Sequence, residues 1–474
     1  MLEADAEAMR RSGLTHLLSV SGLHIAAAVG AAMLLTLKLL ALSERLALRF
    51  NLILVAAGVG ALTGIAYTLL TGAQVPTVRS CVAALLVLAG IALGRDAISI
   101  RLLAVGALLV MLFRPEALAG ASFQLSFAAV ASIIALHSTA WARRTFQRRD
   151  EVWPARLARA VVALIATGLA VELTLIPIAL YHFHKSGLYG VAANIIAIPL
   201  TTFVIMPLEA GALLLDIVGL GPPLWWLAGL ALDLLLGLAH LVADSRGAIV
   251  MMAAMPAWAL GTMIAGALWL FLWTTRPRLW GLALILLGAV AAALSPKPDL
   301  LITGDGRHLA VVDADGTPLL LRERSGEFIR SVVADSAGFD DEPEELESRP
   351  FASCSSDSCI ALLERGGRRW QILATRSAQS IEWRALVRAC SDADIVVSSR
   401  WLPRGCTPRW LKLDRDSLGR TGGVAVYLGT EPRAVTVAER IGKHPWAAGV
   451  PKQMRYGPRV RAKESADAPI RDRT

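Results

Sequence analysis

Long apolar runs separated by short polar connections occupy the chain from Leu14 to Leu294, after which the pattern becomes polar. A helix needs roughly 20 mostly apolar residues to cross the hydrocarbon core of a bilayer. The pattern therefore predicts about ten membrane crossings. These cover residues 14–41, 52–71, 76–94, 98–113, 119–140, 157–183, 190–216, 223–243, 249–273 and 279–294.

Some of the predicted crossings are irregular. Residues 14–41 are long enough to begin with an interfacial stretch, and residues 98–113 are short enough for a re-entrant segment. Pro199 and Pro207 predict a broken helix in residues 190–216, because a proline removes a backbone hydrogen bond that a neighbour, a side chain or water must then replace.

The polar part of the chain shows short β-type runs punctuated by Gly, Asp and Pro. The runs are 309–312, 319–321, 372–374, 394–397 and 424–428. We expect a loop in the acidic, serine-rich residues 336–358. The predicted fold class is an α-helical polytopic membrane protein followed by a smaller α/β soluble domain. The predicted domains are a short N-terminal segment 1–13, a transmembrane domain 14–296, a soluble domain 297–442 and a disordered basic tail 443–474.

Composition and charge refine this prediction. A hydrophobic share of 55% exceeds the 45–50% that is usual for soluble domains. The net charge of +9 can indicate nucleic-acid binding, and cytoplasmic arginines of a membrane protein produce the same excess. The arginine-rich connection 143–159 is predicted to be cytoplasmic. Counting crossings outward from it places both termini and the soluble domain in the periplasm, on the outer side of a bacterial inner membrane.

The five cysteines divide between the two parts of the chain. Cys81 lies in an apolar run. The disulfide candidates all lie in the polar part and are Cys354, Cys359, Cys390 and Cys406. An even set in one soluble domain indicates disulfides in an oxidising compartment, with the pairing left open. Free buried thiols are the alternative, and the spacing does not form a zinc ribbon.

Polar side chains inside the predicted crossings are costly, at roughly 2.5–3.5 kcal/mol for a charged group at a helix centre. Such groups usually line a path or pair with one another. They are His16, His24, Arg79, Gln124, Glu172, Glu209, Asp216, Asp233 and His240. Asp233 and His240 are two helical turns apart and could form a hydrogen bond. Arg79 follows a glycine- and proline-containing break, where it could hold a carboxylate, a phosphate or exposed carbonyl groups, or simply extend to the interface.

Several segments, in this order, resemble motifs of the ComEC family, the inner-membrane channels of natural DNA competence. The segments are 13–24 (GLTHLLSVSGLH), 76–80 (PTVRS), 113–116 (FRPE), 120–127 (GASFQLSF), 177–183 (PIALYHF) and 194–200 (NIIAIPL). The resemblance covers about residues 10–275. Many family members carry a further domain before this region, so the abrupt start, without a signal-peptide pattern, leads us to expect an N-terminal truncation.

The resemblance implies a channel that passes one DNA strand from periplasm to cytoplasm. The implied partners are single-stranded DNA, the lipid bilayer, a periplasmic DNA receptor and a cytoplasmic helicase, and a homo-oligomer is a further expectation. No nucleotide-binding P-loop string occurs, so the energy must come from the partner helicase. We expect no cofactor. The residues expected to line or gate the path are His16, Ser21, His24, Arg79, Gln124 and Glu172.

The start of the soluble domain resembles the metallo-β-lactamase-like domain that ends many ComEC proteins. The matching segments are 302–308 (ITGDGRH) and 313–316 (DADG). In active relatives clustered histidines and an aspartate hold two metals that activate water. Here the polar part of the chain contains only His308 and His444, and no His-x-His-x-Asp-His string. We therefore expect a degenerate, metal-free domain without nuclease activity.

One further pattern in this domain mixes cations with aromatic rings. Arg400, Arg404, Arg409, Arg415 and Arg420 surround Trp401 and Trp410. Such a mixture suits single-stranded DNA, because arginines contact the backbone and tryptophans stack on bases. The alternative is a solvated arginine face with two core tryptophans.

Two other functions compete with the channel. Midplane carboxylates such as Glu172 and Glu209, together with a broken helix, are typical of small-molecule or ion transporters. An intramembrane hydrolase built on Ser21 and His24 is the other. It lacks a Gly-x-Ser-x-Gly elbow and has no carboxylate nearby in sequence to orient the histidine. We expect no catalytic residue.

Overall fold

The computed structural model describes residues 3–17, 22–94, 99–147, 149–377 and 382–442. The chain forms two compact units. The helical unit comprises Met1–Val250 and Met255–Ala293, and the C-terminal unit comprises Met251–Ala254 and Leu294–Thr474. The predicted tail 443–474 lies outside the described residues.

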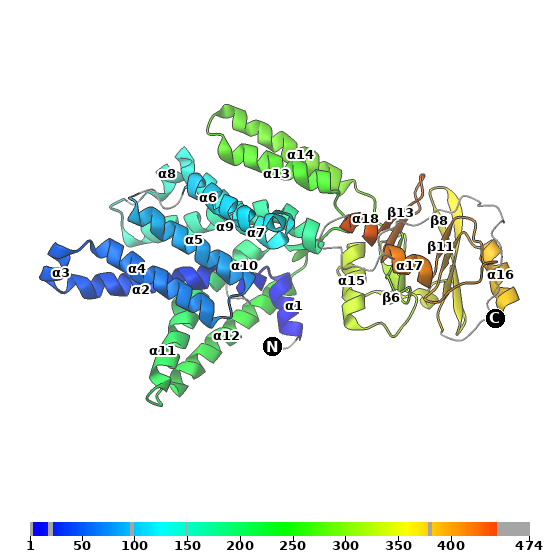
Figure 1. Ribbon diagram of the computed structural model, residues 1–474, viewed down its shortest axis with the longest axis horizontal. Coiled ribbons are helices and arrows are strands. Elements are labelled where there is room, and N and C mark those ends of the chain that lie inside the picture. The colour runs from blue at the N-terminus through cyan, green and yellow to red at the C-terminus, as the bar shows by residue number, and fades with distance from the viewer. Residues whose placement is uncertain (1–2, 18–21, 95–98, 148, 378–381, 443–474) are drawn as a thin grey trace, which may run out of the picture. The chain divides into compact units, whose positions relative to one another are not determined.

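Helices account for nearly all of the helical unit (Figure 1). Two short strands, β1 and β2, pair with each other. The elements in chain order are α1 (Glu3–Arg11), η1 (Thr15–Leu17), α2 (Gly22–Ala41), α3 (Glu44–Arg49), α4 (Leu52–Leu70), α5 (Val75–Ala92), α6 (Ile100–Phe113), η2 (Pro115–Ala119), α7 (Ala121–Ser138), α8 (Ala140–Phe146), α9 (Trp153–Phe183), β1 (Lys185–Gly187), α10 (Gly190–Leu200), η3 (Thr201–Ile205), α11 (Met206–Asp216), α12 (Pro222–Ala243), β2 (Ile249–Met251), α13 (Ala257–Leu272), η4 (Arg276–Leu279) and α14 (Trp280–Ala293).

Among the described residues, seven helices are long and apolar enough to cross a membrane, and α5, α6 and α13 are shorter apolar helices. Each of them lies within or overlaps one predicted crossing, so the predicted fold class is confirmed. Their large apolar side chains, such as Leu34 and Leu35, point outward and are exposed. Small residues fill the contacts between helices. A Cβ added to Gly266 of α13 would lie 2.5 Å from the carbonyl oxygen of Gly281 in α14, so these two helices touch backbone to backbone.

The predicted crossing 249–273 begins later in the structure than the sequence suggests. Residues 249–251 form strand β2, and α13 begins only at Ala257, directly after Pro256. Proline favours an extended residue before it and fits the start of a helix, which explains the later start. The predicted break in 190–216 is a π-helical turn, η3, with Pro199 before it and Pro207 after it. A π turn absorbs the lost hydrogen bonds without ending the helix.

The C-terminal unit contains two packed β-sheets (Figure 1). The six-stranded sheet has the order β13-β12-β3-β4-β5-β6, and the five-stranded sheet has the order β11-β10-β9-β8-β7. The elements are β3 (Leu300–Ile302), β4 (Leu309–Val312), β5 (Pro318–Leu320), α15 (Glu327–Ala337), β6 (Glu344–Glu345), η5 (Leu346–Ser348), β7 (Ala352–Cys354), β8 (Ser358–Arg365), β9 (Arg368–Thr375), α16 (Trp383–Asp392), β10 (Ile395–Val397), β11 (Leu411–Leu413), α17 (Arg415–Thr421), β12 (Val424–Tyr427), β13 (Arg433–Thr436) and α18 (Val437–Ile441).

Three apolar clusters define the layers of this unit. The inward faces of both sheets share one core that includes Leu300, Val311 and Ile372. On the outer face of the first sheet, Val333 of α15 packs against Ala310 and Leu320. On the outer face of the second sheet, α16 packs through Leu386 and Cys390. The resulting helix–sheet–sheet–helix order is compatible with the predicted metallo-β-lactamase-like fold.

The prediction of a loop in residues 336–358 is wrong in part. This stretch contains β6, η5 and β7. β6 is an exposed pair of glutamates that lies parallel to β5 at the edge of its sheet, so its sequence carries no apolar signal. Only pairing with a neighbouring strand makes it extended.

Two disulfides join the four cysteines of this unit. Cys354 of β7 is bonded to Cys359 of β8, its partner in the strand register. Cys390 of α16 is bonded to Cys406 in the connection before β11. Cys81 in the helical unit is free and buried.

Candidate functional site

Arg79 joins the start of α5 to the start of α7. Its Nη2 donates a hydrogen bond to Oγ of Ser122. Pro76 occupies the first turn of α5, where a missing backbone N–H does no harm, and the arginine follows one turn later. In the part of the chain that the structure describes, the buried Nε of Arg79 has no hydrogen-bond partner. The guanidinium is therefore anchored on one side and retains donor capacity on the other.

Gln124 connects α7 to two other elements. Its Nε2 donates to the carbonyl oxygen of Leu118 at 3.0 Å, and its Oε1 lies 3.0 Å from Nε2 of His182 in α9. Because the amide oxygen accepts, the imidazole proton must lie on Nε2. Phe123 beside it is buried and stacks on Phe127 at 4.3 Å, which directs the neighbouring glutamine away from that ring pair.

Glu172 binds the start of α10. Its carboxylate accepts hydrogen bonds from the backbone N–H groups of Gly190 and Val191. A carboxylate is favoured there, because the first N–H groups of a helix lack partners and carry partial positive charge. Gly190 leaves room for the carboxylate, since a Cβ on this residue would lie only 3.3 Å from Oε2 of Glu172. The backbone of Gly13 also approaches closely, because a Cβ on Gly13 would lie 3.1 Å from Cα of Gly190. Glu172 thus ties the middle of α9 to the next helix.

His24, near the start of α2, has two titratable neighbours. Glu209 of α11 interacts electrostatically with His24, and also with the hydroxyl of Tyr67 in α4. His16 of η1 interacts electrostatically with His24. Glu209 lies in the first turn of α11, directly after the π-helical turn. His16 is exposed, His24 is half-buried, and Ser21 between them lies outside the described residues.

These contacts form a continuous series. The start of α2 is next to α5, since a Cβ on Gly22 would lie 3.6 Å from Oγ of Ser80. From there the contacts already described lead to α7, α9 and α10. We call this set the polar layer. Its members are His16, His24, Arg79, Ser122, Gln124, Glu172, His182 and Glu209. No hydrogen bond or ion pair links Arg79 to Glu172 among the described residues. Arg79 instead contacts Ser122 of α7, and Glu172 contacts the start of α10.

Sequence reasoning missed three partners in this region. Ser122 and His182 lie inside the segments 120–127 and 177–183, which resemble family motifs. The sequence alone predicts no role for either residue. Tyr67 gave no signal, because a tyrosine near the end of an apolar helix is common at a membrane interface.

The pairing of Asp233 with His240 is not formed in the described structure. Instead, Nε2 of His240 lies 3.0 Å from Oδ1 of Asp5 in α1. Spacing along one helix could suggest only a partner on that helix, whereas α1 packs against α12 and supplies a closer carboxylate.

The chemistry of the polar layer is suited to anions and to proton-bearing groups. A half-buried guanidinium with a free Nε can bind a phosphate or carboxylate oxygen. The imidazoles can donate or accept hydrogen bonds according to their protonation state. Near η3, the described residues include further buried oxygens without partners, Oδ1 of Asn194 and Oγ1 of Thr201 and Thr202.

Comparison with known proteins gives a family match and several relatives. The competence protein family model matches residues 1–277. The uncharacterized protein YcaI of Escherichia coli (strain K12) is 35% identical over 235 residues, which cover 48% of this chain and 29% of that protein. ComE operon protein 3 of Bacillus subtilis (strain 168) is 30% identical over 211 residues, 44% of this chain and 24% of that protein. Competence protein ComA of Neisseria gonorrhoeae is 35% identical over 221 residues, which cover 46% of this chain and 28% of that protein.

Each of these matches covers less than a third of the relative's own length. No solved structure matches the chain.

Proposed function

Because this chain belongs to the competence protein family, we propose that its helical unit carries single-stranded DNA across the inner membrane during natural transformation. The observation that supports this most directly is Arg79, a half-buried guanidinium whose Nε has no partner among the described residues. It stands among imidazole, amide and hydroxyl groups in the polar layer. Guanidinium is the side chain best suited to hold a passing phosphodiester, because its planar donors match the phosphate oxygens.

The polar layer is the proposed periplasmic end of the path. It contains the starts of α2, α5, α7 and α10 and the end of α9. The arginine-rich connection 143–159 precedes the opposite end of α9, and such connections are retained in the cytoplasm. DNA delivered by a periplasmic receptor would meet the polar layer first, and a cytoplasmic helicase would pull the strand from the other side.

We further propose that the C-terminal unit does not cut DNA. Within the residues that the structure describes, no group of three or more His, Cys, Asp and Glu side chains could hold a metal ion. His308 interacts electrostatically with Asp305 and with two cations, Arg307 and Arg322, and neighbouring positive charge disfavours metal binding. Degradation of the second strand would then belong to another protein.

The test is DNA uptake by a competent host whose own copy of the gene is replaced. Arg79→Ala is compared with Arg114→Ala, a matched control at an exposed arginine close to the start of α7. Loss of a charge-assisted contact of about 1.5–3 kcal/mol predicts about 10- to 100-fold fewer transformants for Arg79→Ala, with labelled DNA accumulating in the periplasm. Arg114→Ala should behave as wild type. Unchanged transformation after deletion of the gene would refute the proposal.

A transporter of ions or small molecules is the second candidate. Glu209 favours it, because it interacts with His24 and Tyr67 and because two threonine oxygens on the adjoining π turn have no hydrogen-bond partner among the described residues. In that case Glu209→Gln would abolish solute flux into proteoliposomes, and deletion of the gene would leave transformation unchanged.

A further inference from the structure

A cavity of about 690 Å³ opens in the C-terminal unit where several strands end. The turn between β3 and β4 contributes Asp305 and Arg307, the connection after β10 contributes Trp401, and α17 contributes Arg415. The turn between β3 and β4 contacts the backbone at the end of β10. Gly306 adopts a φ of 65°, and a Cβ there would lie 2.7 Å from the carbonyl oxygen of Ser398. The two loops that form the cavity are therefore held together by backbone contact.

Arg307 of the cavity lining belongs to a group of arginines that interact electrostatically. Burial, followed by the like charges of Arg307, Arg376 and Arg400, lowers the pKa of Arg322, and only Asp305 opposes the effect. The same neighbourhood acts on His308, where burial and the charges of Arg322 and Arg307 outweigh Asp305 and lower its pKa. A cluster of cations that disfavour one another's charge would be stabilised by a bound anion.

The protein's own carboxylates neutralise this cluster only in part. Oδ1 of Asp305 already accepts hydrogen bonds from Oγ1 of Thr303 at 2.5 Å and from the backbone N–H of Arg307 at 3.0 Å. Arg376 is paired with Glu347 at 2.6 Å.

Across the described ranges, Arg307, Arg322 and Arg415 form no ion pair with a carboxylate, and the buried Nε of Arg322 lacks any hydrogen-bond partner. A buried donor without a partner is destabilising, so Arg322 keeps an uncompensated positive group close to Arg307.

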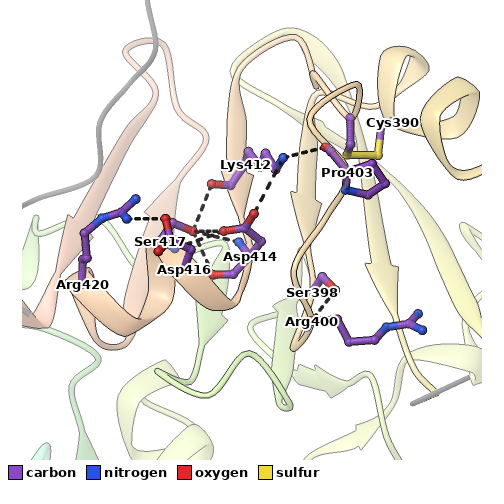
Figure 2. A network of polar contacts seen from close by, with 10 residues as sticks. Cys390, Ser398, Arg400, Pro403, Lys412, Asp414, Asp416, Ser417 and Arg420 are labelled. Atoms are coloured by element: carbon purple, nitrogen blue, oxygen red, sulfur yellow. Dashed lines mark hydrogen bonds and ion pairs between the residues drawn. A yellow bond between two sulfur atoms is a disulfide. The ribbon is translucent and has the colours of Figure 1, made fainter. Parts of the chain in front are cut away.

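The two tryptophans of the arginine-rich stretch have different surroundings. Trp410 packs against the core, with its ring 5.3 Å from that of Trp370. Trp401 is 69% exposed at the cavity, and the guanidinium of Arg415 lies 4.7 Å from its ring centroid. Figure 2 shows that Asp416 faces Arg420, whereas the side chain of Arg400 extends away from the Lys412–Asp414–Ser417 network. An exposed ring held by a cation offers a flat surface for a base.

We propose that this cavity binds single-stranded DNA without a metal, with Arg307 of its lining holding a phosphate, Arg322 adding positive charge behind it, and Trp401 stacking on a base. The inference rests on the proposed function for the identity of the ligand, and it assigns the C-terminal unit a role in holding the strand. A single strand fits better than a duplex, because a base must leave its own stack to reach Trp401. No bond is made or broken.

The test uses the full chain in detergent and a fluorescently labelled oligothymidylate. Trp401→Ala should weaken binding about 5- to 100-fold, the usual effect of losing one base stack. Trp383→Ala is the matched control, because Trp383 is also exposed and carries a guanidinium, that of Arg384, 5.5 Å from its ring. Arg307→Gln should weaken binding and reduce the salt dependence by about one phosphate contact, whereas Arg384→Gln should not.

A second measurement locates the site independently of folding effects. An oligonucleotide with 5-bromouracil, crosslinked by light, should attach to a peptide that contains Trp401 and not to one that contains Trp383. Inorganic phosphate and duplex DNA serve as competitors. Equal binding by duplex, crosslinks elsewhere only, or affinity unchanged in Trp401→Ala would overturn the inference. Full displacement by millimolar phosphate, with no effect of Trp401→Ala, would reduce the cavity to a simple anion site.

Failure of DNA binding at this cavity and failure of the proposed channel function give different experimental results. If Arg79→Ala blocks uptake while Trp401→Ala binds DNA normally, only this inference fails. If Trp401→Ala loses DNA binding while deletion of the gene leaves transformation unchanged, only the proposed function fails.

Discussion

Nε2 of His182 in α9 lies 3.0 Å from Oε1 of Gln124 in α7, although the two residues are 58 positions apart in the chain. The contact joins two segments that resemble family motifs, 120–127 and 177–183. It explains why each segment carries a polar side chain within an otherwise apolar helix, because each of the two groups supplies the other's partner.

This contact predicts a measurable coupling between the two helices. Gln124→Leu and His182→Phe should each destabilise the protein, and the double variant should lose about 0.5–1.5 kcal/mol less than the sum of the single variants. Unfolding in mixed micelles measures the three free energies. His137→Phe is the matched control, because within the described residues the ring of His137 hydrogen-bonds the carbonyl of Ile133, one turn earlier in the same helix, and a phenylalanine can keep its ring contact with Phe146. Additive effects of the two substitutions would show that the contact contributes nothing.

The packing of α1 on α12 predicts a sensitive position at Met9. This side chain is 2% exposed and belongs to a cluster with Leu14, Ala239 and Ala243. Met9→Ala should lower the free energy of unfolding by about 2 kcal/mol or more, because the cavity left behind cannot close fully. Arg10→Ala, one residue away and exposed, should change it by less than about 0.5 kcal/mol. Equal effects of both variants would contradict the docking of α1.

The two disulfides should contribute unequally to stability. In the chain-entropy account, a link across 16 residues, as in Cys390–Cys406, stabilises by about 3 kcal/mol, and a link across five, as in Cys354–Cys359, by about 2 kcal/mol. Thermal unfolding of the full chain should therefore shift more when Cys390 and Cys406 are both replaced by alanine than when Cys354 and Cys359 are. Insensitivity of the melting temperature to reductant would show that neither bond stabilises the fold.

The proposed orientation predicts opposite results for two reporter fusions. Alkaline phosphatase joined after residue 442 should be active, because that enzyme requires the oxidising periplasm. The same reporter joined at residue 147, in the arginine-rich connection, should be inactive. A reversed pattern would place the C-terminal unit in the cytoplasm and remove the proposed direction of DNA movement.

Acid should destabilise the C-terminal unit in two steps. Burial lowers the pKa of His308 in the folded chain below its ordinary value of 6.5. As the pH falls below 6.5, this histidine therefore takes up a proton in the unfolded chain first. The free energy of unfolding then declines until the histidine of the folded chain is protonated as well. For Asp305, burial is outweighed by hydrogen bonds from Thr303 and Arg307, which lower the pKa below 3.8. Its stabilisation is present above 3.8 and is lost as the pH falls through the lower, folded value.

Hydrogen exchange of peptides from β4, measured against pH in the full chain, tests this prediction. His308→Gln should remove the first decline and leave the second. His137→Gln, at an exposed residue of the helical unit, should retain both. An unchanged first decline in His308→Gln would assign it to another group.

The positions of the apolar helices and several strands follow from local pattern alone. Hydrocarbon thickness sets how long an apolar run must be, so the runs ending at Ala41, Leu70 and Ala243 could be recognised without knowing any partner. The run 309–312 coincides with β4, because a short apolar run that contains β-branched residues and is bounded by turn residues is typical of a buried strand. The edge strand β6 escaped detection because its two residues are polar and exposed.

The site depended on the tertiary structure. The sequence singled out Arg79, Gln124 and Glu172 as polar groups that needed partners, yet Ser122, His182 and the N–H groups of Gly190 and Val191 come from other helices. In the same way, Arg307, Arg322, Arg376 and Arg400 are spread over several elements, and only the packing of two sheets brings their charges together. Periodicity reports which side of an element is buried, whereas the identity of a partner is decided by chain topology and by the requirement that buried polar groups be satisfied.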